Sequence, residues 1–215
     1  MSLILSPEEI RVLGVLIEKD MATPEYYPMS PNALMNGCNQ KTNRDPMTSF
    51  PEHVIGDTLD ALRSRQLVSS LTGGSNRVPK WSHRAQEILN LNNREMAVMC
   101  VLMLRGAQTL NEIKTRTESL YKFDDHDAVE TVLNKLAERG MAVLLPKSPG
   151  SREPRWTHLL LGEPVLPSAS VSASAGESAS PSHAGTSPLA ERVAALETEM
   201  VLLKEQFAAF RKQFE

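Results

Sequence analysis

Apolar residues recur at helical spacing in two similar stretches of the chain, and each stretch leads into the same further patterns. The repeated stripe consists of two matching triplets, Ile55, Leu59 and Leu62, and Val129, Leu133 and Leu136. Residues three or four apart lie on one face of an α-helix, so each triplet predicts an amphipathic helix. Both helices lead through an apolar stretch and a turn to a segment that ends on a tryptophan, Trp81 or Trp156. The pattern therefore predicts the same helix and β-hairpin twice.

The hairpins are predicted from short apolar runs on either side of turn-forming residues. Strands are expected over 67–71 and 141–145. Gly, Ser, Asn and Pro gather over 72–76 and over 146–151, and these residues favour the tips of hairpins.

The segment before each repeated stripe predicts two more helices. Ser6 and Glu9 have the spacing of a capping box, which marks the start of a helix. The matching helix of the second copy, over 92–104, is apolar on almost all sides, which predicts burial at a seam between the copies. Short second helices are expected over 30–37 and 109–115.

Three helices followed by a hairpin are typical of a winged helix-turn-helix domain. The sequence therefore predicts an α+β, mainly helical fold with two such domains in tandem. We place the first domain at residues 1–90 and the second at residues 91–163.

The composition changes after the second domain. Residues 164–188 consist mainly of Ser, Ala, Pro and Gly, without an apolar period, which predicts a disordered linker.

The last segment, residues 189–215, has an unbroken heptad pattern and predicts a coiled-coil helix. The seam comprises Leu189, Val193, Leu196, Met200, Leu203, Phe207, Phe210 and Phe214. A parallel homodimer would bring Arg192 to Glu197 and Glu199 to Lys204, which are opposite charges. An antiparallel pairing and a higher oligomer remain open alternatives.

Several stretches resemble the YceH family of bacterial proteins, a group without an assigned activity. The resemblance rests on residues 5–14, Glu18-Lys19, Cys-Asn-Gln-Lys-Thr-Asn-Arg-Asp-Pro at 38–46, and residues 94–99, and it covers about residues 3–161. It implies a tandem winged-helix fold and brings no catalytic residues.

Composition and charge narrow the possible partners. The formal net charge is −3 and the pI is about 6.0, so no overall field attracts nucleic acid and any such binding depends on local patches. The N-terminus lacks the basic region and cleavage site of a signal peptide, and no long apolar run occurs, so we expect a cytoplasmic protein that does not enter a membrane. Cys38 and Cys100 both adjoin predicted helices, which suits buried, reduced thiols.

Basic residues on both hairpins are the first candidate for a functional site. They are Arg77, Lys80 and Arg84 in the first copy, and Lys147, Arg152 and Arg155 in the second. Cations beside Gly and Ser, which let the backbone approach closely, are suited to binding phosphate. The alternative is that these charges only keep an edge hairpin soluble.

The second candidate is the polar loop ahead of the third helix. Gln40, Lys41, Asn43 and Arg44 supply donors that could reach phosphates and base edges. The third helices oppose this interpretation, because both begin with several acidic residues, and a helix that reads DNA normally presents cations or amides there.

Two further observations argue against a metal-binding or catalytic site. His83 and His158 each follow a tryptophan by two positions, so each lies on the same strand face as that tryptophan. No Cys, His or carboxylate recurs near them at the spacing of metal ligands, so we expect each histidine to pack against its tryptophan rather than to bind a metal. No catalytic, metal-binding or cofactor motif is present, so we do not expect an enzyme.

These observations favour a DNA-binding or transcription-regulator-like protein that contacts double-stranded DNA through its basic hairpins and the 40–44 loop. Its coiled coil would join two chains. The alternative is a scaffold for protein partners that does not bind DNA, which the acidic third helices favour.

Overall fold

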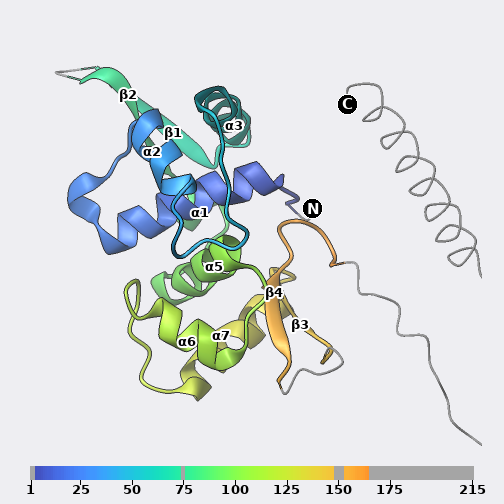
Figure 1. Ribbon diagram of the computed structural model, residues 1–215. Coiled ribbons are helices and arrows are strands. Elements are labelled where there is room, and N and C mark those ends of the chain that lie inside the picture. The colour runs from blue at the N-terminus through green and yellow to red at the C-terminus, as the bar shows by residue number, and fades with distance from the viewer. Residues whose placement is uncertain (1–2, 74–75, 148–152, 165–215) are drawn as a thin grey trace, which may run out of the picture. The chain divides into compact units, whose positions relative to one another are not determined.

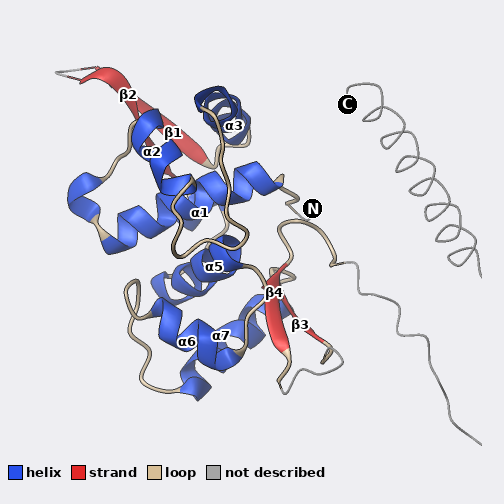
Figure 2. Cartoon of the chain, in the orientation of Figure 1, coloured by secondary structure: helices blue, strands red, loops and turns tan. Residues whose placement is uncertain are grey.

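Two antiparallel hairpins and a set of helices make up the part of the chain that the structure describes (Figure 1). This computed structural model describes residues 3–73, 76–147 and 153–164. The prediction of a helix-rich α+β fold is confirmed at this level, because about half of these residues are helical and both sheets are small and antiparallel (Figure 2). The predicted linker beyond Pro164 and the predicted coiled-coil segment 189–215 lie outside the described residues.

The first half contains α1 (Pro7–Ala22), the 3-10 helix η1 (Pro24–Tyr26), α2 (Pro31–Cys38), α3 (Glu52–Ser64), β1 (Val68–Gly73), β2 (Asn76–His83) and α4 (Ala85–Ile88). The second half contains α5 (Asn93–Arg105), α6 (Leu110–Thr117), α7 (His126–Glu138), β3 (Ala142–Leu145) and β4 (Arg155–His158). The helices η1 and α4 were not predicted, because segments of three and four residues are too short to show a period.

Side-chain caps start α1 and α5, and the cap of α1 confirms the prediction from its sequence. The Ser6 hydroxyl accepts the Glu9 N–H at 3.2 Å, and the Glu9 carboxylate accepts the Ser6 N–H at 2.7 Å. Asn92 and Glu95 form the same reciprocal box at the start of α5. Each box satisfies two donors that a helix leaves unpaired, so it fixes where the helix begins.

Both tryptophans pair with a third backbone segment in addition to their hairpin. Trp81 exchanges two backbone hydrogen bonds with Met29, at 2.8 and 3.0 Å, and Trp156 does the same with Gln108, at 2.7 and 2.9 Å. Met29 and Gln108 lie just before the caps of α2 and α6. The two halves therefore repeat this pairing, which the sequence did not reveal because a single bridge has no period.

An ion pair at each third helix also repeats. Arg65, at the end of α3, lies 3.0 Å from the capping carboxylate of Glu9, and Arg139, at the end of α7, lies 3.4 Å from that of Glu95. Both arginines also donate to backbone carbonyls just before the first helix of their half. Each half is thus closed by the same contact between its first and third helices.

Helices α1 and α5 pack together at the centre of a single compact unit (Figure 1). The predicted burial of α5 is confirmed, since every residue from Met96 to Leu104 is buried. Gly14 allows the close approach, because a Cβ there would lie 2.9 Å from Leu104 Cδ2. The Cys100 thiol donates to the Gly14 carbonyl at 3.4 Å. The predicted domain boundary at 90/91 falls between α4 and α5 and stays a prediction.

The two ends of this unit also meet. The Leu5 N–H donates to the Leu160 carbonyl at 2.7 Å, so the segment before α1 lies against the segment after β4.

Candidate functional site

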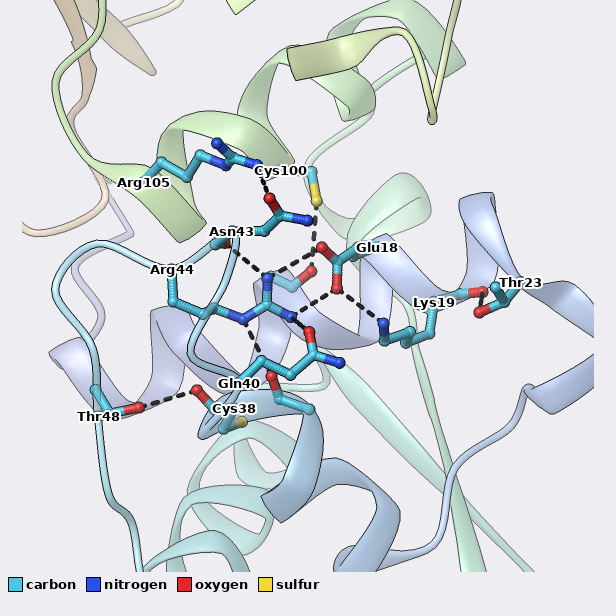
Figure 3. A network of polar contacts seen from close by, with 12 residues as sticks. Glu18, Lys19, Thr23, Cys38, Gln40, Asn43, Arg44, Thr48, Cys100 and Arg105 are labelled. Atoms are coloured by element: carbon cyan, nitrogen blue, oxygen red, sulfur yellow. Dashed lines mark hydrogen bonds and ion pairs between the residues drawn. The ribbon is translucent and has the colours of Figure 1, made fainter.

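The loop between α2 and α3, which we predicted to read nucleic acid, points its arginine inward (Figure 3). The side chain of Arg44 is 0% exposed. Its two terminal nitrogens bind the Glu18 carboxylate side by side, at 3.0 and 2.6 Å, and its Nε donates to the Gly37 carbonyl at 3.0 Å. Arg44 therefore cannot contact a nucleic acid in this conformation, because its guanidinium has no exposed surface.

Two amide oxygens of the loop also accept internal hydrogen bonds. Gln40 Oε1 accepts a further hydrogen bond from Arg44 at 2.9 Å, and Asn43 Oδ1 accepts one from Arg105 of α5. Lys41 alone of the four predicted residues is exposed without a partner among the residues described. The loop thus offers one unpaired cation, Lys41, and loses its arginine to the interior, while the amides of Gln40 and Asn43 are oriented by the hydrogen bonds that their oxygens accept.

This loop joins the two halves. The Asp45 N–H donates to the Leu104 carbonyl at 2.9 Å, and Arg11 of α1 donates to the Pro46 carbonyl at 2.5 Å. With the contact of Asn43 to Arg105, the loop bonds to both α1 and α5. We therefore interpret it as a brace between the central helices.

The electrostatics of the brace follow from burial and charge. Burial alone would raise the pKa of Glu18, but the hydrogen bonds and charge of Arg44, with a smaller effect of Lys19, hold that pKa below its ordinary value. Burial raises the pKa of Cys38 to about 12 and raises that of Cys100 as well. Both cysteines are buried, which confirms the predicted location of the two thiols, while their reduced state stays a prediction.

The basic residues predicted to bind phosphate on the two hairpins differ in whether they already form ion pairs. Arg84 is paired with Glu87 at 2.9 Å, and Arg155 with Glu112 at 3.0 Å. Within the described residues, Lys80 and Lys147 have no partner. Arg77 lies in β2, but its side chain is not described, and Arg152 falls outside the described residues.

The first hairpin is apolar on the side that faces away from Trp81. Leu71 pairs with Lys80 in the register, and Val78 shares their face because it lies two residues along the strand. Leu71 is 55% exposed and Val78 is 51% exposed. Exposed apolar side chains close together favour contact with a protein over contact with phosphate.

The exposed face of α3 is acidic. Glu52, Asp57 and Asp60 are all exposed, and only Asp60 has an ion-pair partner among the described residues, Arg63 at 2.9 Å. Gly56 lies on the same face, and a Cβ there would meet nothing within 4 Å. This face, which we call the α3 acidic face, therefore presents negative charge around a position where a partner could approach the helix backbone.

A groove of about 370 Å³ runs beside the α3 acidic face, between α3 and the start of α1. Val54, Thr58 and Ala61 contribute its apolar lining, Glu8 and Asp57 contribute carboxylates, and the one lining cation, Arg65, is paired with Glu9 at 3.0 Å. An apolar groove with carboxylates along it suits a segment that carries both apolar and basic side chains.

The Trp–His corners are packed, as the sequence indicated. His83 Nε2 lies 3.2 Å from Asp20 Oδ2, and its backbone N–H donates to the Tyr27 hydroxyl at 2.6 Å. Burial lowers the pKa of His83, and the charge of Asp20 offsets part of that shift. His158 is buried without such an offset, and burial lowers its pKa to about 4.

The described residues contain no group of three or more His, Cys, Asp or Glu side chains placed to hold a metal ion. None of the helices within those residues combines the length and apolar character needed to cross a membrane.

Known proteins with similar sequences carry names that specify neither a reaction nor a ligand. The sequence matches a family described as "Protein of unknown function, DUF480" over residues 5–151. It is 46% identical to a UPF0502 protein of Solibacter usitatus over 98% of both chains. A UPF0502 protein of Aeromonas hydrophila is 42% identical over 97% of this chain and 98% of its own. Another, from Geobacter sulfurreducens, is 43% identical over 100% of both.

Proposed function

This chain belongs to the DUF480 family of proteins of unknown function, and we propose that it is a non-enzymatic module that binds another protein through the α3 acidic face. The proposal rests on the surface of the protein itself. The order of three helices and a hairpin in each half supports a tandem winged-helix architecture. The narrower resemblance to YceH proteins is part of the same proposal.

The α3 acidic face carries the proposal. In a winged helix that reads DNA, the third helix enters the major groove and its neighbours contact phosphates. Glu52 and Asp57 are exposed without an ion-pair partner among the described residues, so a DNA backbone placed there would meet uncompensated negative charge. The same charges would attract a partner with a basic surface, and they would mainly raise its rate of association and the specificity of binding.

The internal contacts of the polar loop 40–44 support the same conclusion. Its arginine is bound to Glu18 and the amide oxygens of Gln40 and Asn43 accept internal hydrogen bonds, so the loop loses its guanidinium as a base-reading group and the orientation of both amides is fixed by the brace. The exposed Leu71 and Val78 add apolar surface of the kind that protein interfaces bury.

The test is affinity purification of the full chain from its own cells, followed by quantitative mass spectrometry. The variant Glu52→Lys/Asp57→Lys/Asp60→Lys inverts the α3 acidic face. The control variant Glu25→Lys/Glu118→Lys/Glu163→Lys makes the same charge change at exposed acids elsewhere. We expect specific partners to be lost with the first variant and retained with the second. Equal retention by both would contradict the proposal.

DNA binding is the second candidate, and the unpaired Lys80 and Lys147 on the two hairpins favour it. Fluorescence anisotropy with mixed genomic DNA at low salt decides between the two. Non-specific DNA-binding proteins associate at about 10 μM under such conditions. We expect no binding there. Binding that weakens in Arg77→Gln/Lys80→Gln/Arg84→Gln would instead establish the DNA-binding function.

A further inference from the structure

A second groove, of about 760 Å³, opens where α5 begins, with one wall formed by α7. It adjoins an inner pocket of about 250 Å³, because Gln86, Asn93 and Tyr121 line both. The combined space has the size of a small-molecule site. It shares no lining residue with α3, and residues of both halves form its walls.

Two cations in the outer groove lack a counter-charge among the residues described. Arg94 is held by a hydrogen bond from its Nε to the Tyr121 hydroxyl at 2.8 Å, and its guanidinium lies 5.5 Å from the centre of the Tyr121 ring. No carboxylate among the described residues binds its terminal nitrogens. Lys135, on α7, lines the same groove and has no partner in that part of the chain. The groove therefore has a guanidinium held by Tyr121 and an exposed ammonium, both with unused donors.

The single carboxylate that lines the outer groove does not neutralise them. Glu95 accepts the Asn92 N–H at 2.9 Å as part of the helix cap, and it lies 3.4 Å from Arg139. It is also buried. A ligand with two negative charges would consequently balance the outer groove, whereas a neutral ligand would leave it positive.

The inner pocket has the opposite character. Asp20, from the end of α1, lines it and is oriented by His83, whose Nε2 lies 3.2 Å from Asp20 Oδ2. The side chains of Gln86 and Asn93 hydrogen-bond to each other at 3.3 Å where the two spaces meet. A carboxylate beside two amides suits hydroxyl or amino donors on a ligand.

We propose that this groove binds a phosphomonoester whose organic part carries hydroxyl or amino groups. The phosphate lies between Arg94 and Lys135, where a planar guanidinium can bind two of its oxygens and the ammonium a third. The organic part extends past Asn93 towards Asp20. Inorganic phosphate alone would occupy the outer groove and leave the inner pocket empty, so the organic part supplies both additional affinity and selectivity.

The test is a titration of the ¹⁵N-labelled full chain, followed by nuclear magnetic resonance, with ribose 5-phosphate and adenosine 5′-monophosphate. Inorganic phosphate, ribose and adenosine are the comparison probes. We expect at least one phosphomonoester to bind more tightly than inorganic phosphate and to shift resonances of groove residues, with no binding of ribose or adenosine.

Three variants in the groove assign the contacts, and a fourth outside it is their control. Lys135→Gln and Arg94→Gln should each weaken phosphomonoester binding by about tenfold, since each removes a charge-assisted hydrogen bond. Lys41→Gln, the same change at an exposed lysine outside the groove, should leave binding unaltered. Asp20→Asn should weaken the phosphomonoesters without changing the affinity for inorganic phosphate.

Three results would overturn the assignment. One is the absence of shifts at groove residues with either phosphomonoester up to roughly 10 mM, which is weaker than a specific site would be. The second is equal affinity for inorganic phosphate and the phosphomonoesters. The third is equal weakening of binding by Lys41→Gln, which would indicate a non-specific anion effect only.

Discussion

A single arginine shows how far a residue's role can differ from its position in a polar loop. Arg44 lies among exposed residues in the sequence, yet its side chain has no exposed surface and binds Glu18 of α1. A buried charge is tolerated only when a partner compensates it, and that partner lies 26 residues earlier in the chain. Sequence patterning predicted the polar loop but could not predict which way its side chains point.

Removal of Arg44 should destabilise the protein strongly. Arg44→Ala removes the two-point partner of the partly buried Glu18 and leaves only Lys19, 3.3 Å away, so we expect the free energy of unfolding to fall by about 3 kcal/mol. Lys41→Ala, in the same loop but exposed, should change it by less than about 0.5 kcal/mol. Urea denaturation of both variants measures the difference, and similar values for the two would contradict the brace.

His158 should make stability depend on pH. Burial lowers its pKa from 6.5 to about 4, so the unfolded chain binds a proton more readily than the folded one. The stabilisation is complete above about pH 6.5 and is lost as the pH falls towards 4, by an amount on the order of 3 kcal/mol. Unfolding free energies at several pH values should show a slope that His158→Gln flattens and His126→Gln, at an exposed ring, retains.

Backbone conformation supplies another residue-scale test. Gln66 has φ of +61° directly after α3, and Gly140 has φ of +68° at the matching position after α7. Only glycine adopts this region without strain, so Gln66→Gly should raise the unfolding free energy by about 0.5–1 kcal/mol. Gly140→Ala should lower it by a similar amount. Thermal and chemical denaturation should agree on these opposite signs.

At the scale of elements, apolar period and capping pattern were sufficient to predict the long helices and both hairpins. Ser6 and Glu9 cap α1 as their spacing indicated, and α5 is buried as its continuous apolar run required. The bridge between Met29 and Trp81 was missed, because one pair of residues leaves no periodic signal. The groove beside α5 was missed for a related reason: its lining comes from several separate segments.

Two helical glycines should respond oppositely to the same substitution. A Cβ at Gly37 of α2 would lie 2.7 Å from Val15 Cγ1, and a buried β-branched side chain on a helix has little freedom to move. Gly37→Ala should therefore destabilise the fold by about 1–3 kcal/mol. Gly56→Ala meets open space on α3 and should stabilise it by about 1 kcal/mol. Equal signs in urea denaturation would disprove this packing.

For the whole molecule, the repeat explains why the charges and contacts of one half recur in the other. The ion pairs of Arg65 and Arg139 and the backbone bridges of both tryptophans are duplicated, while the brace at Arg44 exists only in the first half. Duplicated contacts maintain each half, and the unique loop joins α1 to α5. Sequence comparison between the halves therefore predicts the shared fold better than it predicts their junction.

Assembly of two chains remains a prediction from the heptad pattern, because residues 189–215 lie outside the described residues. We expect the full chain to be a dimer in light scattering and a chain ending at residue 164 to be a monomer. Leu196→Asp, on the predicted seam, should give monomers, whereas Ala195→Asp, beside it, should not. A dimer that persists after truncation would place the interface elsewhere.

The hydrogen bond from Leu5 to Leu160 has a topological consequence. Because the polypeptide enters and leaves the folded body at one point, a short synthetic bridge could fuse those ends without disturbing the helices. New termini could then be opened at residues 74–75, between β1 and β2, so that a ribosome would make β2, α4 and the whole second half before it makes α1 to β1.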